Sequence, residues 1–169
     1  MLEIERKYLA KINPQTLPIP EEVVEVEQGY IVAASTWEWR VRRVVHRGPL
    51  TGDDYGRDYT TAIKIGNGFV RKEYEYYIPH MLYALLSVLV PKGTWIHKTR
   101  LGISKWAVDI FDGDLKGLVL SEIEIDSEQE ELPQIPEGLT LIGDVTGNTI
   151  FSNKCLSRIG PLGSQALHY

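Results

Sequence analysis

The chain has few of the features that mark disulfide-rich, secreted or membrane-spanning proteins. Cys155 is the single cysteine among 169 residues, so no intramolecular disulfide can form. The longest apolar run, from Met81 to Val90, has about half of the roughly 20 residues that a helix needs to cross a bilayer. No basic segment followed by an apolar run opens the sequence. We therefore expect a soluble, cytoplasmic protein without a membrane partner.

Common signatures of metal, nucleotide and acyl chemistry are also absent. The sequence has no Cys/His spacing for a metal cluster, no Walker or Rossmann glycine loop, and no Ser/His/Asp signature. Gly66, Asn67 and Gly68 predict a hairpin turn, because no helical pattern follows them as in a phosphate-binding loop. The net charge of -5 disfavours a nucleic-acid partner, although it is compatible with a local basic site.

Composition and periodicity predict one domain, residues 1–169, that consists mainly of strands and ends in a tail at 160–169. A hydrophobic content of 43% suffices for one core. The β-rich segments are residues 3–9, 23–33, 36–45, 59–65, 69–78, 94–103, 106–111 and 118–126. Proline, glycine or acidic residues predict connections at 13–22, 46–58 and 128–138.

Two segments have helical patterns. Beyond Pro79, apolar residues recur at helical spacing and predict a helix that packs through Met81, Leu82, Leu85, Leu86 and Leu89. Residues 149–158 predict a final helix, with Asn148 or Thr149 as N-cap. Its candidates for burial are Ile150, Cys155 and Leu156.

The first strand places charged residues at alternate positions. Successive side chains of a strand point to opposite faces, so Glu3, Glu5 and Lys7 share one face. By itself such a face is typical of a strand that exposes its charges to solvent. Its interpretation therefore depends on whether other strands repeat the pattern.

The same alternation of charge recurs on about six strands. The acidic residues on these faces are Glu3, Glu5, Glu73, Glu75, Asp109, Glu122 and Glu124. The basic residues are Lys7, Arg40, Arg42, Lys64, Arg71, Lys98 and Arg100. This repetition predicts a shared charged lumen, which a barrel provides because alternate residues of every strand point inward. We expect an α+β, mainly β fold: an antiparallel, closed or nearly closed eight-stranded barrel with helices packed outside.

The predicted barrel reverses the usual pattern, with apolar residues on its outer face. Those expected to face outward, covered by the two helices, are Ile4, Val41, Val108, Ile123 and Ile125. Buried charges without partners are costly, so the lumen must be wet, internally paired or filled with a ligand of matching charge.

The residue types in the lumen indicate the chemistry of that ligand. Arginine and lysine bind phosphate oxygens, and arginine can bind two oxygens at once. Clustered carboxylates bind hard divalent cations such as Mg²⁺ or Mn²⁺. A polyphosphate with about two bound divalent ions uses both sets and is nearly neutral, which meets the requirement for paired charge.

The opening Glu3-Ile4-Glu5-Arg6-Lys7 resembles the ExExK signature of the CYTH family, the triphosphate tunnel metalloenzymes. The resemblance extends from residue 3 to about 158. Its further segments are Gln28-Gly29-Tyr30, Arg40-Val41-Arg42, Ala62-Ile63-Lys64, Arg71-Lys72-Glu73-Tyr74-Glu75, Lys98-Thr99-Arg100, Trp106 to Phe111, Glu122-Ile123-Glu124 and Ser152-Asn153-Lys154. This resemblance implies an antiparallel tunnel of about eight strands.

The resemblance also implies roles for individual residues. It assigns a set of acids to the metal ions: Glu3, Glu5 and Glu124 closest, then Glu122, Asp109 and Glu75. It assigns a set of bases to the phosphates: Arg40, Arg42, Lys64, Arg71, Lys98 and Arg100. Lys7 and Tyr30 resemble a catalytic pair, although Tyr30 could equally pack in the barrel wall. We expect Glu73 to pair with a neighbouring arginine, and Glu38 and Asp126 to lie at a solvated rim.

The predicted function is metal-dependent hydrolysis of inorganic triphosphate to diphosphate and phosphate. Small stand-alone members of the family with this opening and the Gln-Gly-Tyr segment resemble that branch. Thiamine triphosphatase, with Trp37, Trp39 or Trp95 receiving the ring, and class IV adenylate cyclase remain alternatives. A catalytically silent polyphosphate-binding module also remains open. If the chain forms a homodimer, we expect contact through its outer apolar surface or its helices.

Overall fold

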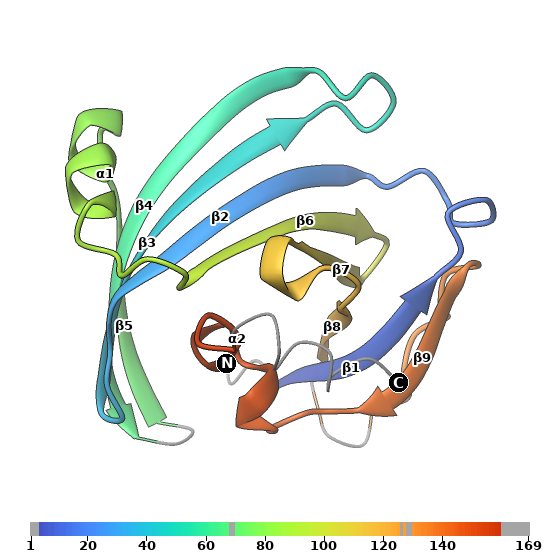
Figure 1. The fold of residues 1–169 in the computed structure, drawn as a ribbon. Coiled ribbons are helices and arrows are strands. Elements are labelled where there is room, and N and C mark those ends of the chain that lie inside the picture. Colours follow the sequence, from blue (N-terminus) through green and yellow to red (C-terminus); the bar gives the residue numbers. More distant parts are fainter. Residues whose placement is uncertain (1–3, 68–69, 126, 128–129, 160–169) are drawn as a thin grey trace.

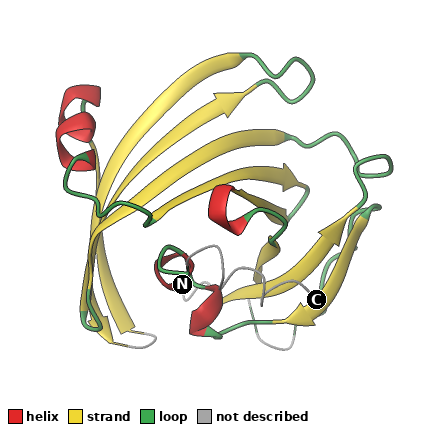
Figure 2. Cartoon of the chain, viewed as in Figure 1, coloured by secondary structure: helices red, strands yellow, loops and turns green. Residues whose placement is uncertain are grey.

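The computed structural model describes residues 4–67, 70–125, 127 and 130–159. This part of the chain forms a single antiparallel sheet of nine strands, in the order β5-β4-β3-β2-β6-β7-β8-β1-β9 (Figures 1 and 2). The strands are β1 (Ile4–Ile12), β2 (Glu22–Ala33), β3 (Trp37–Arg47), β4 (Asp54–Asn67), β5 (Val70–Tyr77), β6 (Trp95–Ile103), β7 (Trp106–Asp112), β8 (Val119–Ile125) and β9 (Leu139–Asp144). The helices are α1 (His80–Ser87), α2 (Asn153–Leu156) and the 3-10 helices η1 (Gly113–Leu115) and η2 (Thr149–Phe151).

The sheet curves strongly but does not close into a barrel. The prediction was a closed or nearly closed barrel of eight strands, so its antiparallel, mainly β character is confirmed, whereas the strand number is wrong and closure does not occur. All eight predicted strands are present. A ninth strand, β9, was not predicted; it pairs with β1 from Tyr8 to Ile12. It occupies the free edge of β1, so β5 and β9 become the two edges of the sheet.

The connection predicted at residues 46–58 is much shorter in the structure. Pairing of β3 with β4 continues to Arg47 and Asp54, which leaves residues 48–53 as the loop. His46 Nε2 lies 2.9 Å from the Asp58 carboxylate, and the Arg57 guanidinium bonds to Asp54. Polar contacts therefore extend the hairpin. These segments lack the alternation of apolar residues that would identify a strand in the sequence.

Much of the outer face of the sheet is apolar, as the charge alternation predicted, although Glu25, Glu27 and Arg43 also lie on it. Val41, Val108, Ile123 and Ile125 are all buried. Val41 packs with Tyr83 of α1, and α1 lies outside β3 and β4 (Figure 1). The other three belong to a cluster around Trp106, which Leu17 and Leu132 of the irregular connections cover. The prediction that two helices cover this face is therefore confirmed only for α1.

The helix after Pro79 forms, but it packs through a different face from the predicted one. Tyr83 is buried and Leu86 packs beside it, whereas Met81, Leu85 and Leu89 are exposed. The reason is that α1 spans only two turns and rests on the sheet through the bulky Tyr83 ring. None of the helices in the described part of the chain has the length and hydrophobicity that a membrane span requires.

The final helix is broken in two and lies on the inner side of the sheet, not outside it (Figure 1). Asn148 accepts a hydrogen bond from the Ile150 amide and caps η2, and Ser152 caps α2. Of the three residues predicted to be buried, Leu156 is buried, Cys155 is partly buried and Ile150 is exposed. Phe151 and Leu156 pack against a set of buried residues of the inner face: Leu9, Tyr30, Ile96, Phe111, Leu118 and Leu120. One end of the concave side is therefore filled with apolar side chains.

We predict that Gly29→Ala destabilises the fold. A Cβ at this position would lie 2.7 Å and 2.9 Å from the methyl groups of Val90 and 3.0 Å from the Trp95 ring. Overpacking of this kind costs about 1–3 kcal/mol of unfolding free energy, which urea denaturation measures.

Gly143→Ala is the matched control, because its added Cβ meets nothing within 4 Å. Combining Gly29→Ala with Val90→Ala should cost less than the sum of the two single changes, since they relieve each other. Equal stability of Gly29→Ala and Gly143→Ala would contradict the proposed clash.

Candidate phosphate-binding cavity

Strand register brings the charged residues of distant segments onto the concave face. Directly opposed residues of antiparallel strands share a face, and the register opposes Lys7 to Glu122 and Arg100 to Asp109. A cavity of about 320 Å³ lies on this face. It is lined by Glu5, Lys7, Tyr30, Glu38, Arg40, Arg42, Lys64, Arg100, Glu122, Ser152, Asn153 and Lys154. Six of these side chains are cationic and three are acidic.

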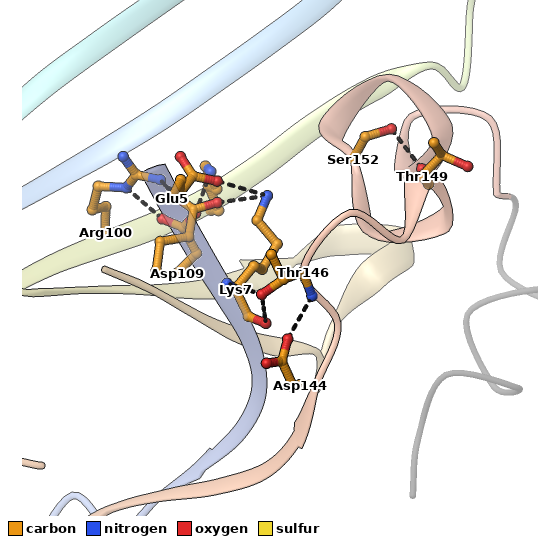
Figure 3. Close-up of polar contacts among 10 residues, drawn as sticks. Glu5, Lys7, Arg100, Asp109, Asp144, Thr146, Thr149 and Ser152 are labelled. Carbon is orange, nitrogen blue, oxygen red and sulfur yellow. Dashed lines mark hydrogen bonds and ion pairs between the residues drawn. The ribbon is translucent and has the colours of Figure 1, made fainter. Parts of the chain in front are cut away.

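Asp109 holds together the charges on the β6–β8 side of the cavity. Its carboxylate is 1% exposed and accepts hydrogen bonds from Lys98 Nζ at 2.5 Å and Arg100 Nε at 2.7 Å. Arg100 also bonds to Glu122 at 2.5 Å. Burial opposes ionisation of Asp109, but the charges of Lys98 and Arg100 outweigh it and lower its pKa to about 2. Figure 3 shows Arg100 directed at Asp109.

Lys7 is held in place through both its backbone and its side chain (Figure 3). Its backbone N–H donates to Thr146 Oγ1 at 3.0 Å, and the Thr146 amide donates to Asp144. Its Nζ lies 2.8 Å from Glu122 and 3.6 Å from Glu5. Burial disfavours the ammonium charge, yet these carboxylates raise the pKa of Lys7, so it remains a cation.

A second set of ion pairs occupies the β3–β5 side of the cavity. Arg40 lies 2.8 Å from Glu73 and 3.3 Å from Glu75. Lys64 lies 2.9 Å from the other oxygen of Glu73. Glu73 therefore pairs with a neighbouring arginine, as expected from the sequence. Arg42 lies 4.0 Å from Glu75, and burial lowers its pKa, with a further contribution from Arg40.

Tyr30 and Lys7 line the same cavity, but their contacts in the structure are with other residues. Lys7 binds Glu122, whereas the Tyr30 hydroxyl accepts a hydrogen bond from Gln28 at 2.7 Å. Burial, together with the Glu38 carboxylate, raises the pKa of Tyr30, so the phenol stays protonated. Tyr30 also packs in the apolar cluster with Phe151 and Leu156, so its interpretation as a wall residue is confirmed, and its catalytic role stays a prediction.

Glu38 and Lys154 are cavity residues that the sequence analysis did not assign. Glu38 was predicted to lie at a solvated rim, but it is 5% exposed. The correction follows from α2, which covers this end of β3 and places Lys154 Nζ 3.5 Å from the Glu38 carboxylate. The alternation of Glu38 with Arg40 and Arg42 was a signal in the sequence, but the position of α2 was not. Asp126 lies outside the described residues.

The predicted metal ligands are only partly brought together. Among the described residues no three His, Cys, Asp or Glu side chains are grouped closely enough to hold a metal ion. Asp109, Glu122 and Glu75 are engaged by lysine or arginine. Glu5 and Glu124 face each other in register, and Glu124 is exposed.

Two predicted site residues cannot be placed. Glu3 and the side chain of Arg71 lie outside the described residues, as does the predicted tail at 160–169.

Partial burial and the Glu122 carboxylate raise the pKa of Glu5, so a nearby cation would stabilise its charged form. The donor chemistry at Glu5 and Glu124 thus fits an oxygen-preferring ion.

The fold is similar to that of the protein NE1496. Two crystal structures of NE1496, one describing it as a hypothetical protein and the other as an inorganic triphosphatase, each match with a TM-score of 0.61 and 28% sequence identity. The matches cover 92% and 93% of this chain and 97% and 95% of NE1496. The PH1012 protein from Pyrococcus horikoshii OT3 is less similar, with a TM-score of 0.45, 17% identity, and coverage of 76% of this chain and 80% of PH1012. No protein-family model and no curated protein sequence matches the chain.

We predict that Asp109→Asn is strongly destabilising, because it leaves the buried Lys98 without its counter-charge. Removing one partner of a buried ion pair costs about 3–5 kcal/mol. Since the pKa of Asp109 is lowered to about 2, its contribution is complete above its unfolded pKa of about 3.9 and is lost as pH falls towards 2. The stability difference between wild type and variant, measured by urea denaturation, should therefore shrink below about pH 4.

Glu124→Gln is the control for this experiment, because Glu124 is an exposed carboxylate on a strand adjacent to β7. Its cost should stay within about 0.5 kcal/mol. A similar loss in both variants would show that Asp109 is not the electrostatic centre of the network.

Proposed function

We propose that this protein is a metal-dependent inorganic triphosphatase of the CYTH type, which cleaves tripolyphosphate to diphosphate and phosphate. The observation that carries the proposal is the excess of cations over acids in a concave cavity of about 320 Å³. Such a lining matches a compact polyanion, because converging guanidinium and ammonium groups bind phosphate oxygens. The similarity to the inorganic triphosphatase NE1496 supports the same substrate.

The size and lining of the cavity favour a substrate without an organic ring. Its volume is at the small end of the range for ligand sites, about 300–1,000 Å³. Tyr30 is the one aromatic residue among those that line it. Trp39 points to the opposite face, where its indole N–H donates to Thr61, and Trp95 packs in the outer cluster around Val41. Trp39 and Trp95 therefore give no support to the thiamine triphosphatase alternative, and Trp37 is not among the residues that line the cavity.

The basic residues of the chain would bind and orient the polyphosphate. Arg40 and Arg100 present guanidinium groups that are already fixed by neighbouring acids, and the Arg42 guanidinium is fixed by the amide oxygen of Gln28. Little side-chain freedom is therefore lost on binding. Lys7, held between Glu5 and Glu122, offers a protonated ammonium to a phosphate oxygen or to the leaving group. Positioning and charge stabilisation supply most of the catalysis in phosphoryl transfer.

Glu5 and Glu124, with Glu3 two residues before Glu5, are the residues that would hold Mg²⁺ or Mn²⁺. A bound divalent ion would neutralise charge on the phosphate oxygens and favour attack by water. Asp109 would act differently from a ligand: it is enclosed by Lys98 and Arg100 and keeps Arg100 directed into the cavity.

A substrate panel tests the proposed function. We expect phosphate release from inorganic triphosphate in the presence of Mg²⁺ or Mn²⁺, little release from thiamine triphosphate or ATP, and none after chelation with EDTA. Formation of cyclic AMP from ATP would instead identify a cyclase. Binding of tripolyphosphate without turnover would favour a silent polyphosphate-binding module.

We predict that Glu5→Gln lowers metal-dependent turnover by at least about 100-fold, the typical cost of losing one electrostatic contact to the transition state. The fold should persist, because the Glu5 side chain is half exposed and Lys7 retains Glu122. Glu25→Gln, the same change on the outer face, is the control and should keep full activity. Near-normal turnover of Glu5→Gln would defeat the assignment of this carboxylate.

A further inference from the structure

Gln28 connects two residues of the cavity although it does not line the cavity itself. It lies on β2 and is 1% exposed. Its side-chain oxygen Oε1 accepts a hydrogen bond from Arg42 Nε at 3.0 Å, and its Nε2 donates to the Tyr30 hydroxyl at 2.7 Å. Both polar ends of a fully buried amide are therefore satisfied by residues that face the cavity.

The direction of these hydrogen bonds follows from the chemistry of Arg42. A guanidinium has only donors, so the atom of Gln28 that faces Arg42 must be its carbonyl oxygen. The amide nitrogen, which has only donors, must then face Tyr30. Consequently the Tyr30 oxygen accepts from Gln28, and its own hydrogen must point elsewhere.

The hydrogen of the Tyr30 hydroxyl remains available to a ligand. Among the described residues, the hydrogen bond of this hydroxyl is the one that it accepts from Gln28. Burial raises the pKa of Tyr30, so the hydrogen is retained. An anion in the cavity between Arg40 and Arg42 is thus the natural acceptor.

We propose that Gln28 is a positioning residue that turns the Tyr30 hydroxyl into a hydrogen-bond donor for an oxygen of a bound phosphate group. Arg42 fixes the orientation of the Gln28 amide, and the amide in turn fixes the direction of the Tyr30 hydroxyl hydrogen. One residue that would bind the polyphosphate therefore also orients a second one. The proposal rests on the proposed function for the identity of the anion. Its tests are chosen so that the two can fail separately.

Gln28→Glu tests the direction of the hydrogen bond. A carboxylate can still accept from Arg42, but it must also accept from Tyr30, which turns the phenol hydrogen away from the cavity. We expect kcat to fall about as far as in Tyr30→Phe, roughly 100-fold for loss of a donor to developing charge. KM should change much less, because Arg42 keeps its contact. Adding Gln28→Glu to Tyr30→Phe should cause no further fall in kcat.

Gln28→Met separates orientation from packing. This side chain has a similar length but makes no hydrogen bonds, so the Tyr30 hydroxyl rotates freely and Arg42 loses its anchor. We expect a smaller fall in kcat than in Gln28→Glu, with a rise in KM. If Gln28 only supported the packing, kcat would fall further in Gln28→Met than in Gln28→Glu, because glutamate has the closer shape. Glu27→Gln is the matched control, because Glu27 is adjacent in β2 and contacts Arg43 and Tyr83 on the outer face.

A spectroscopic measurement tests Gln28 without reference to turnover. With ¹³Cζ-labelled tyrosine, the Tyr30 signal is assigned by its loss in Tyr30→Phe. We expect this signal to move to lower field in Gln28→Glu, where the phenol donates to a carboxylate. In the wild type, it should move in the same direction when tripolyphosphate is added without metal.

The outcomes separate the two proposals. If the wild type hydrolyses none of the triphosphates, the proposed function fails, and the Tyr30 signal still decides the role of Gln28. An unchanged Tyr30 signal in Gln28→Glu, full kcat in that variant, or additive losses with Tyr30→Phe would overturn the positioning role. A wild-type signal that does not respond to tripolyphosphate would overturn donation to phosphate.

Discussion

The structure depends on pairing charges inside a concave sheet. Removing a charged group from water is costly unless an opposite charge and hydrogen bonds compensate. Asp109 meets this requirement for Lys98 and Arg100, and Glu73 meets it for Arg40 and Lys64. Antiparallel register places Arg100 opposite Asp109 and Lys64 opposite Glu73, whereas Arg40 reaches Glu73 across the intervening strand β4. The sheet itself therefore holds these charges in a stable arrangement.

Apolar packing elsewhere compensates for this charged interior. The outer face is covered by α1 and by the connections around Trp106, and the inner face is filled at one end by Phe151 and Leu156. Hydrophobic burial is the dominant favourable contribution to folding. The chain can therefore leave a polar cavity in the remaining part of the concave side, where the cations outnumber the acids.

Much of this arrangement could be predicted because strand geometry is local. Alternation at every second residue identified eight strands and assigned Arg40, Arg42, Lys64 and Arg100 to one face. Two features could not be predicted in this way. The short strand β9 has weak alternation and forms only because β1 offers an edge. Glu38 looked like a rim residue because nothing local shows that α2 covers it.

By itself, the sequence determined which face each charged side chain takes, since that depends only on the period of a strand. It also predicts a polyphosphate with bound divalent ions as the ligand, because the same residue types recur on each strand, and this stays a prediction. Only the tertiary structure decided which acids remain available for a cation and which are consumed in ion pairs. It also decided that the sheet stays open and that Gln28 links Arg42 to Tyr30. These properties depend on distances between segments far apart in the chain, which periodicity does not contain.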